Sequence, residues 1–154
     1  MDAALIPTRR INTEAPSAET RRRARLVWLQ TAQDLKEARH MQQQNRAHDA
    51  RFLALQVASN ALTTVAMLLG YFQFPYSSPT QMLQLCEEAD PRLTPLREAC
   101  QRLEVAQEMD PFTNEPPSAE EEAETMAQLL LDAEAIRTAV FGVLKQHKKE
   151  WIKP

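Results

Sequence analysis

The longest uncharged stretch of the chain lies near its middle, since no Asp, Glu, Lys or Arg occurs between Arg51 and Glu87. In its first half, residues 52–69, apolar residues recur at helical spacing on one side and uncharged polar residues recur on the other. One side holds Leu53, Val57, Ala58, Ala61, Leu62, Val65 and Leu69, and the other holds Gln56, Ser59, Asn60 and Thr63. A helix at the surface of a protein usually carries charges on its polar side. The pattern therefore predicts a central helix whose polar side faces another helix, a second subunit or a ligand.

A first long helix is predicted before this segment. Ser17 is a suitable N-cap, and the helical pattern runs from it to about Asn45. The side chains expected to face the core are Trp28, Leu29, Ala32, Leu35 and Ala38. The second helix is expected to end before Gly70, because glycine favours the left-handed conformation that follows a helix. Residues 1–16 contain two prolines and no apolar period, and we interpret them as a flexible arm.

Three further segments follow Gly70. Capping-box spacings begin two of them, at Ser78 and Ser118, where a serine is followed three residues later by glutamine or glutamate. The first box predicts a short helix ending near Ala89, and the second predicts the last long helix. Thr94 and Pro95 are expected to open a segment between them. The core positions expected in the last helix are Met126, Leu129, Leu130, Ala133, Ile136, Val140, Phe141 and Leu144.

Composition agrees with a helical protein, because the chain has only two glycines and is rich in Ala, Leu, Gln, Glu and Arg. We expect an all-α fold over residues 17–150, a single up-and-down bundle of four to five helices. No secretory signal is visible at the N-terminus. Residues 52–74 carry too many polar groups for a membrane span. The expected location is therefore cytoplasmic, without membrane insertion.

Charge and cysteines add little chemistry. The basic N-terminal run, Arg9, Arg10, Arg21, Arg22, Arg23 and Arg25, is either a solvated face or a contact for nucleic acid or acidic lipid. Cys86 and Cys100 have the character of small buried hydrophobes in a reducing compartment. The three histidines, His40, His48 and His147, are too scattered for a metal site. We therefore expect neither a metal nor a cofactor.

The order of these pieces resembles the HEPN domains, a family of small helical bundles. The family pattern A-x-F-x-A-x-Q-A-A-x-x-A-L, closed by L-L and glycine, corresponds to residues 51–62, RFLALQVASNAL, and 68–70, LLG. A T-H-x-L-type helix start corresponds to residues 80–83, TQML. Two more runs are similar, residues 32–38, AQDLKEA, and 133–140, AEAIRTAV. The resemblance spans about residues 26–147 and implies a homodimer, with a partner such as a nucleotidyltransferase, or a role in a toxin–antitoxin or defence system.

The chain departs from the family at positions that bear on chemistry. Members often carry Glu-Lys at Ser59 and Asn60, lysine near Thr63 and histidine at Gln81, and all four are absent here. Many members are metal-independent RNases that use an arginine followed by a histidine four to six residues later. Such a pair supplies a base for the ribose hydroxyl and a cation for the phosphate. Here the last helix offers only a pair ten residues apart, which lie roughly 80° from one another about the helix axis.

The expected function is therefore non-catalytic binding of a partner subunit, a nucleotide or RNA in a cleft. The residues expected to bind a ligand or line an interface are Gln56, Ser59, Asn60, Thr63, Arg137 and His147. For the four polar residues of the second helix, a close-packed seam remains an alternative. A protein interface is expected at the aromatic loop, Tyr71, Phe72, Phe74 and Tyr76, which otherwise caps one end of the bundle.

Three alternatives stay open. The chain is an RNase with a diverged active site made of Arg137 and His147, or it is a helical adaptor or chaperone unrelated to the family. His48 and Asp49, at the start of the second helix, form either an acid–base pair or a solvent-facing histidine beside a carboxylate that complements the helix dipole.

Overall fold

The computed structural model describes residues 16–71, 78–87, 90–108 and 118–146. Its elements are α1 (Ala18–Gln43), α2 (Ala47–Leu68), α3 (Pro79–Glu87), the 3-10 helix η2 (Pro91–Leu96), α4 (Arg97–Glu108) and α5 (Ala119–Gln146). The described ranges contain helices and no β-strand. The predicted all-α bundle is thereby confirmed.

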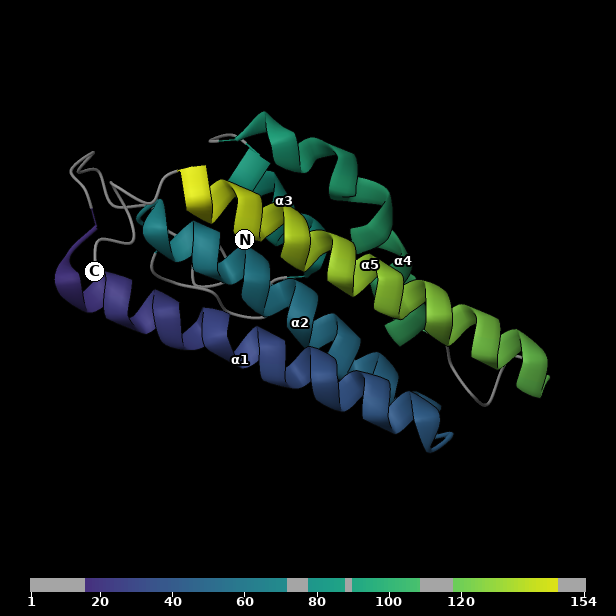
Figure 1. Cartoon of the computed structure of the whole chain (residues 1–154). Coiled ribbons are helices and arrows are strands. Elements are labelled where there is room, and N and C mark those ends of the chain that lie inside the picture. The colour runs from purple at the N-terminus through teal and green to yellow at the C-terminus, as the bar shows by residue number, and fades with distance from the viewer. Residues whose placement is uncertain (1–15, 72–77, 88–89, 109–117, 147–154) are drawn as a thin grey trace.

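Helix α2 is the centre of the bundle, because it packs against α1, α3, α4 and α5. Figure 1 shows the three long helices side by side, with α1 running opposite to both α2 and α5. The shorter elements α3, η2 and α4 pack against each other and against the α2 and α5 helices. Five alanines give α2 a slender buried side that neighbours can approach closely, Ala50, Ala54, Ala58, Ala61 and Ala66.

Among the described helices, α2 also meets the length and hydropathy of a membrane span, with a mean hydropathy of 1.2 over its most apolar window. Half of that window is buried inside the bundle. The core helix of a folded domain can have the same length and hydropathy, because burial among helices and burial in lipid both favour apolar residues.

Most predicted core positions are buried, but three are wrong. Leu29 and Phe141 are 53% and 48% exposed, and Ala32 is exposed as well. Helix α1 contacts α2 along its length and α5 along one edge only. The apolar arc of α1 and of α5 is therefore wider than the surface that their neighbours cover. Trp28 lies at this boundary and is half-buried.

The predicted N-caps of the long helices are confirmed. The Ser17 side chain accepts a hydrogen bond from the backbone N–H of Thr20 at 3.1 Å. In the boxes at Ser78 and Ser118, the serine hydroxyl accepts from the backbone of the residue three positions later, whose side chain accepts from the serine N–H. Gly70 follows α2 with φ 101°, as expected for a residue that ends a helix.

The predicted start of the fourth segment is wrong. Asp90, not Thr94, is the cap, and its side chain accepts from the backbone N–H of Arg92 at 3.0 Å. Thr94 lies inside η2, which begins with Pro91. Proline at the first helical position has a suitable φ and loses no hydrogen bond there. Pro95 has no N–H to donate, so regular α-helical bonding begins only after it.

Two features fasten α3 and α4 to the long helices. Arg102 of α4 donates two hydrogen bonds of 2.8 Å to the buried carboxylate of Asp132 on α5. A carboxylate at 3% exposure requires such a partner, because burial of a lone charge is costly. Cys86 and Cys100 are buried free thiols, as predicted, and the Cys86 thiol donates to the carbonyl of Leu62 at 3.3 Å. Burial raises the pKa of both thiols to about 12.

The two glycines should respond to alanine in opposite directions. Gly70→Ala should lower the free energy of unfolding by about 1 kcal/mol, because a Cβ disfavours positive φ. Gly142 lies inside α5, and a Cβ built there meets nothing within 4 Å. Gly142→Ala should therefore raise the same free energy by about 0.5–1 kcal/mol. Urea unfolding followed by circular dichroism measures both, and shifts of the same sign would contradict this account.

The cysteines should be unreactive in the folded protein at pH 8. The thiolate is the reactive form, and a pKa near 12 leaves very little of it at that pH. Iodoacetamide labelling followed by mass spectrometry should show slow modification of both cysteines, and rapid modification in 6 M urea. Rapid labelling of either cysteine in the native protein would show that the thiol is accessible and ionised.

Candidate functional site

The four polar residues predicted as a ligand or interface stripe lie together on α2 and are half-buried. The hydroxyl of Thr63 donates to the carbonyl of Ser59 at 2.7 Å, within the helix. Within the described chain, the side chains of Gln56, Ser59 and Asn60 make no hydrogen bond to another side chain. Contact with a ligand or a second copy remains a prediction for this stripe.

The other predicted site residues are spread over the molecule. Asp49 pairs with Arg46 at 2.6 Å within the first turn of α2, while His48 is exposed. Tyr71 is buried after the end of α2. The remaining aromatic-loop residues, Phe72, Phe74 and Tyr76, lie outside the described residues, as does His147. The structure thus places one member of the predicted Arg137–His147 pair.

Arg137 belongs to a contact between α1 and α5 that joins residues far apart in the sequence. Its Nε donates to the hydroxyl of Thr31 at 3.0 Å, and its guanidinium carbon lies 4.7 Å from the ring centroid of Trp28. The Thr31 hydroxyl in turn donates to the carbonyl of Trp28 at 2.6 Å. These contacts fix the guanidinium over the indole, where a cation is attracted to the ring face.

A second aromatic ring continues this contact along α5. The Phe141 ring lies parallel to that of Trp28, at an interplanar angle of 6° and a centroid separation of 6.2 Å. Lys145 places its ammonium 5.3 Å from the centre of the Phe141 ring. Helices α1 and α5 are antiparallel. The residue one turn before Trp28 on α1 therefore lies opposite the residue one turn after Phe141 on α5. Arg25 is therefore at the same level as Lys145.

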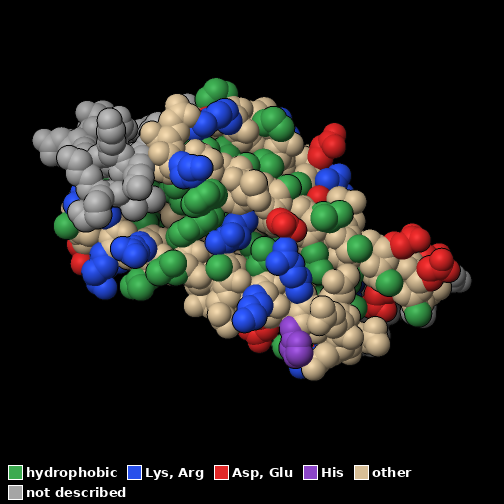
Figure 2. All heavy atoms as spheres, in the orientation of Figure 1, with side chains coloured by type: hydrophobic (Ala, Val, Ile, Leu, Met, Phe, Trp, Pro, Cys, Tyr) green, Lys and Arg blue, Asp and Glu red, His purple; other side chains and the backbone are tan. Residues whose placement is uncertain are grey.

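We call this surface the α1–α5 face and define it by six residues, Arg21, Arg25, Trp28, Arg137, Phe141 and Lys145. In the view of Figure 2, apolar side chains lie among Lys and Arg side chains. At its far end, Arg39 of α1 pairs with Glu134 of α5 at 2.9 Å. Acidic side chains gather beyond this pair, toward the start of α5.

The cations of this face have no acidic partner among the described residues, unlike most of the other described cations. Ion pairs within the described chain engage Arg22, Arg23, Arg39, Arg46, Arg51, Arg92, Arg97 and Arg102. No such pair is made by Arg21, Arg25, Lys36, Arg137 or Lys145. All five lie on α1 or α5, and four belong to the α1–α5 face. Uncompensated positive charge is thus concentrated on one side of the molecule.

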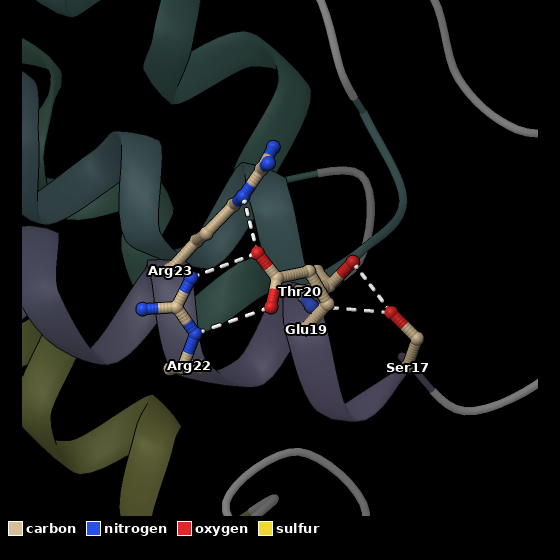
Figure 3. A network of polar contacts seen from close by, with 5 residues as sticks. All are labelled: Ser17, Glu19, Thr20, Arg22 and Arg23. Carbon is tan, nitrogen blue, oxygen red and sulfur yellow. Dashed lines mark hydrogen bonds and ion pairs between the residues drawn. The ribbon is translucent and has the colours of Figure 1, made fainter.

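Among the described residues near the start of α1, Arg21 and Arg25 have no acidic partner, and Arg21 donates to the backbone carbonyl of Pro16 at 2.7 Å. Glu19 accepts hydrogen bonds of 2.9–3.1 Å from Arg22 and Arg23, in the network of Figure 3. These two guanidinium groups hold the pKa of Glu19 at about 2, well below its usual value. Glu19 is the acidic residue of the first turn of α1. It pairs with Arg22 and Arg23, which lie on another side of the helix from Arg21 and Arg25.

The described side chains of the α1–α5 face are suited to binding. Guanidinium and ammonium groups attract anions, and exposed rings offer flat surfaces for stacking. Around Arg137 the described neighbours are a hydroxyl and an indole, neither of which acts as a base at neutral pH. Within the described ranges, no group of three or more His, Cys, Asp or Glu residues could hold a metal ion.

Sequence reasoning identified Arg137 but missed the two rings that surround it. Trp28 and Phe141 occupy apolar positions of their helices, and the periodicity therefore placed them in the core. The missed signal is the spacing Arg137–Phe141–Lys145, in which a large apolar residue stands between two cations at intervals of four. Such a residue lies on the same helical side as both charges.

Comparison with known proteins identifies no relative. No protein-family model matches this chain, no characterised protein matches its sequence, and no solved structure matches its fold. The resemblance to HEPN domains therefore stays a prediction that rests on the sequence runs and the helical architecture.

Proposed function

We propose that this chain is a non-catalytic helical binding module whose α1–α5 face binds single-stranded RNA. The observation that carries the proposal is the gathering of cations without described acidic partners around the half-buried Trp28 and the exposed Phe141. A polyanion gains most from such a surface, because each phosphate it neutralises releases counterions. Four cations within one face supply several such contacts at once.

The arrangement favours a polymer over a small anion. The cations lie at Arg21 and Arg25 on α1 and at Arg137 and Lys145 on α5. At a rise of about 1.5 Å per residue, the α1 pair spans about 6 Å and the α5 pair about 12 Å. Arg25 is level with Lys145, and Arg137 contacts Thr31, ten residues after Arg21 on α1, so the cations follow the face along its length. A strand that lies along this face can contact several cations with successive phosphates.

A role without catalysis is supported by the surroundings of Arg137. Its Nε donates to Thr31 and its guanidinium lies over Trp28, and neither neighbour is the base that RNA cleavage needs beside the attacking hydroxyl. The diverged-RNase alternative would require His147 to supply that base. The alternative of an adaptor or chaperone would require the face to bind protein in preference to RNA.

The HEPN resemblance adds the expectation of a homodimer and of a partner subunit such as a nucleotidyltransferase. On this chain the surface best suited to a second copy is the uncharged side of α2. Phe52 is 53% exposed there, and the half-buried Gln56 and Asn60 have no side-chain partner in the described residues. Neutral amide groups and an exposed ring can be buried against a copy of themselves at little electrostatic cost.

Neutralising one cation of the face should weaken RNA binding, whereas neutralising an ion-paired arginine of the same helix should not. For Arg25→Gln we expect Kd for a 12-nucleotide oligouridylate to rise about 3- to 10-fold, measured by fluorescence anisotropy. The slope of log K against log salt should become shallower by about 0.7, the value for one lost phosphate contact on a single strand.

The matched control is Arg22→Gln, because Arg22 is an exposed arginine on α1 that already pairs with Glu19. This variant should change Kd less than twofold, because its charge is compensated in the free protein. Equal losses for the two variants would show that RNA responds to net charge alone, and an affinity independent of salt would refute the proposed mode of binding.

RNA bound to the protein should remain intact. End-labelled RNA incubated with excess protein, with or without Mg²⁺, should migrate as full-length material on a denaturing gel. Fragments ending in a 2′,3′-cyclic phosphate, lost in both Arg137→Lys and His147→Ala, would establish the RNase alternative. Fragments that persist in both variants would indicate a contaminating nuclease. The Arg137→Lys protein, purified in the same way, then serves as the blank for that contamination.

A further inference from the structure

We propose that Trp28 and Phe141 form a base-stacking platform that Arg137 and Thr31 hold in position, so that the α1–α5 face recognises unpaired bases as well as phosphates. The inference rests on the proposed function and extends it from charge to the chemistry of the ligand. The ligand is single-stranded nucleic acid. Trp28 and Phe141 stack on its bases, and Arg137 and Thr31 position the Trp28 ring.

The Trp28 ring is held in place before any ligand arrives. Thr31 is fully buried, and its hydroxyl joins the backbone of Trp28 to the guanidinium of Arg137. The guanidinium then lies 4.7 Å from the indole centroid, which restricts rotation of the ring. A ring fixed in this way loses little conformational entropy when a base stacks on it, so that more of the stacking energy appears as affinity.

Phe141 extends the platform into solvent. Its ring is 48% exposed and lies within 6° of the plane of Trp28. A centroid separation of 6.2 Å is near the upper end for offset stacked rings, so the two rings overlap only in part. Two parallel, partly uncovered aromatic surfaces beside Lys145 and Arg137 offer stacking and phosphate contacts within one short stretch of strand.

A second exposed phenylalanine shows that exposure alone does not make such a platform. Phe52 on α2 is 53% exposed, yet within the described residues it contacts neither a second ring nor a cation. Phe141 has both kinds of neighbour. This difference provides a matched control on the same molecule.

The combination of charge and rings favours nucleic acid over an acidic polypeptide. Glutamate side chains would neutralise the cations but leave the ring surfaces without a stacking partner. The bases of a single strand have flat faces that stack on aromatic side chains whatever the sequence, beside phosphates of the required charge. Bases within a duplex are already stacked on one another and cannot reach the rings.

The decisive comparison uses two ligands of equal length and charge, a 12-nucleotide oligouridylate and a 12-unit abasic phosphodiester. We expect the protein to bind the oligouridylate about tenfold more tightly than the abasic strand. Phe141→Leu should reduce the ratio of these two affinities, and Phe52→Leu should leave the ratio unchanged. Circular dichroism of each variant verifies the fold.

Two further readouts separate stacking from charge. In a Trp151→Phe background Trp28 is the single tryptophan, and its fluorescence should be quenched by the oligouridylate but not by the abasic strand. Arg137→Lys keeps the charge but loses the planar group over Trp28. It should therefore weaken oligouridylate binding several-fold while abasic affinity stays within twofold of the wild type.

The outcomes distinguish this inference from the function on which it rests. Equal affinity for the two strands, with unchanged Trp28 fluorescence, would overturn the stacking platform while leaving RNA binding in place. Failure to bind either strand would overturn the proposed function and the platform with it. Tighter binding of a 12-residue polyglutamate than of the oligouridylate would assign the face to an acidic protein partner and overturn both.

Discussion

The burial of α2 is the constraint on which the rest of the fold depends. Helix α2 has 22 residues and carries no charge after Arg51, so most of its length cannot be left in water on all sides, and four other helices pack against it. The free energy comes from apolar area removed from water, spread over fully buried residues such as Val57, Leu62 and Val65. Its alanines let these neighbours approach closely, so that one slender helix serves as the core of the whole bundle.

Covering α2 leaves apolar surface uncovered elsewhere. Helices α1 and α5 each present one side to α2 and meet one another along a narrow edge, where Trp28 and Phe141 come together. Both rings occupy positions that continue the apolar arcs of their helices, Trp28 at the edge of the core and Phe141 outside it. The site thus arises where two amphipathic helices carry more apolar residues than the packing can use.

The described cations fall into two groups, those in ion pairs and those without an acidic partner. Seven described ion pairs join residues no more than four positions apart or fasten α4 to its neighbours, and these compensate most of the described arginines. Four of the five described cations that lack an acidic partner belong to the α1–α5 face. Exposed pairs contribute little to stability, so the arrangement of the unpaired charges matters more for what the molecule can attract.

Sequence alone determined the features that depend on neighbours along the chain. The caps at Ser17, Ser78 and Ser118, the helix end at Gly70 and the core of the last helix follow from hydrogen bonds and spacings within a few residues. The central position of α2 also followed, since an uncharged helix must be covered. The start at Asp90 was missed because Thr94 offers the same local signal three residues inside the 3-10 helix.

Tertiary structure decided which apolar residues lie in the core and which cations lack partners. Arg137 and Thr31 are 106 residues apart, and no local pattern specifies that they touch. Periodicity gives the direction in which Phe141 points about its helix axis, but not how far a neighbouring helix extends over it. That extent depends on the antiparallel register of α1 and α5, which the packing of both helices on α2 sets.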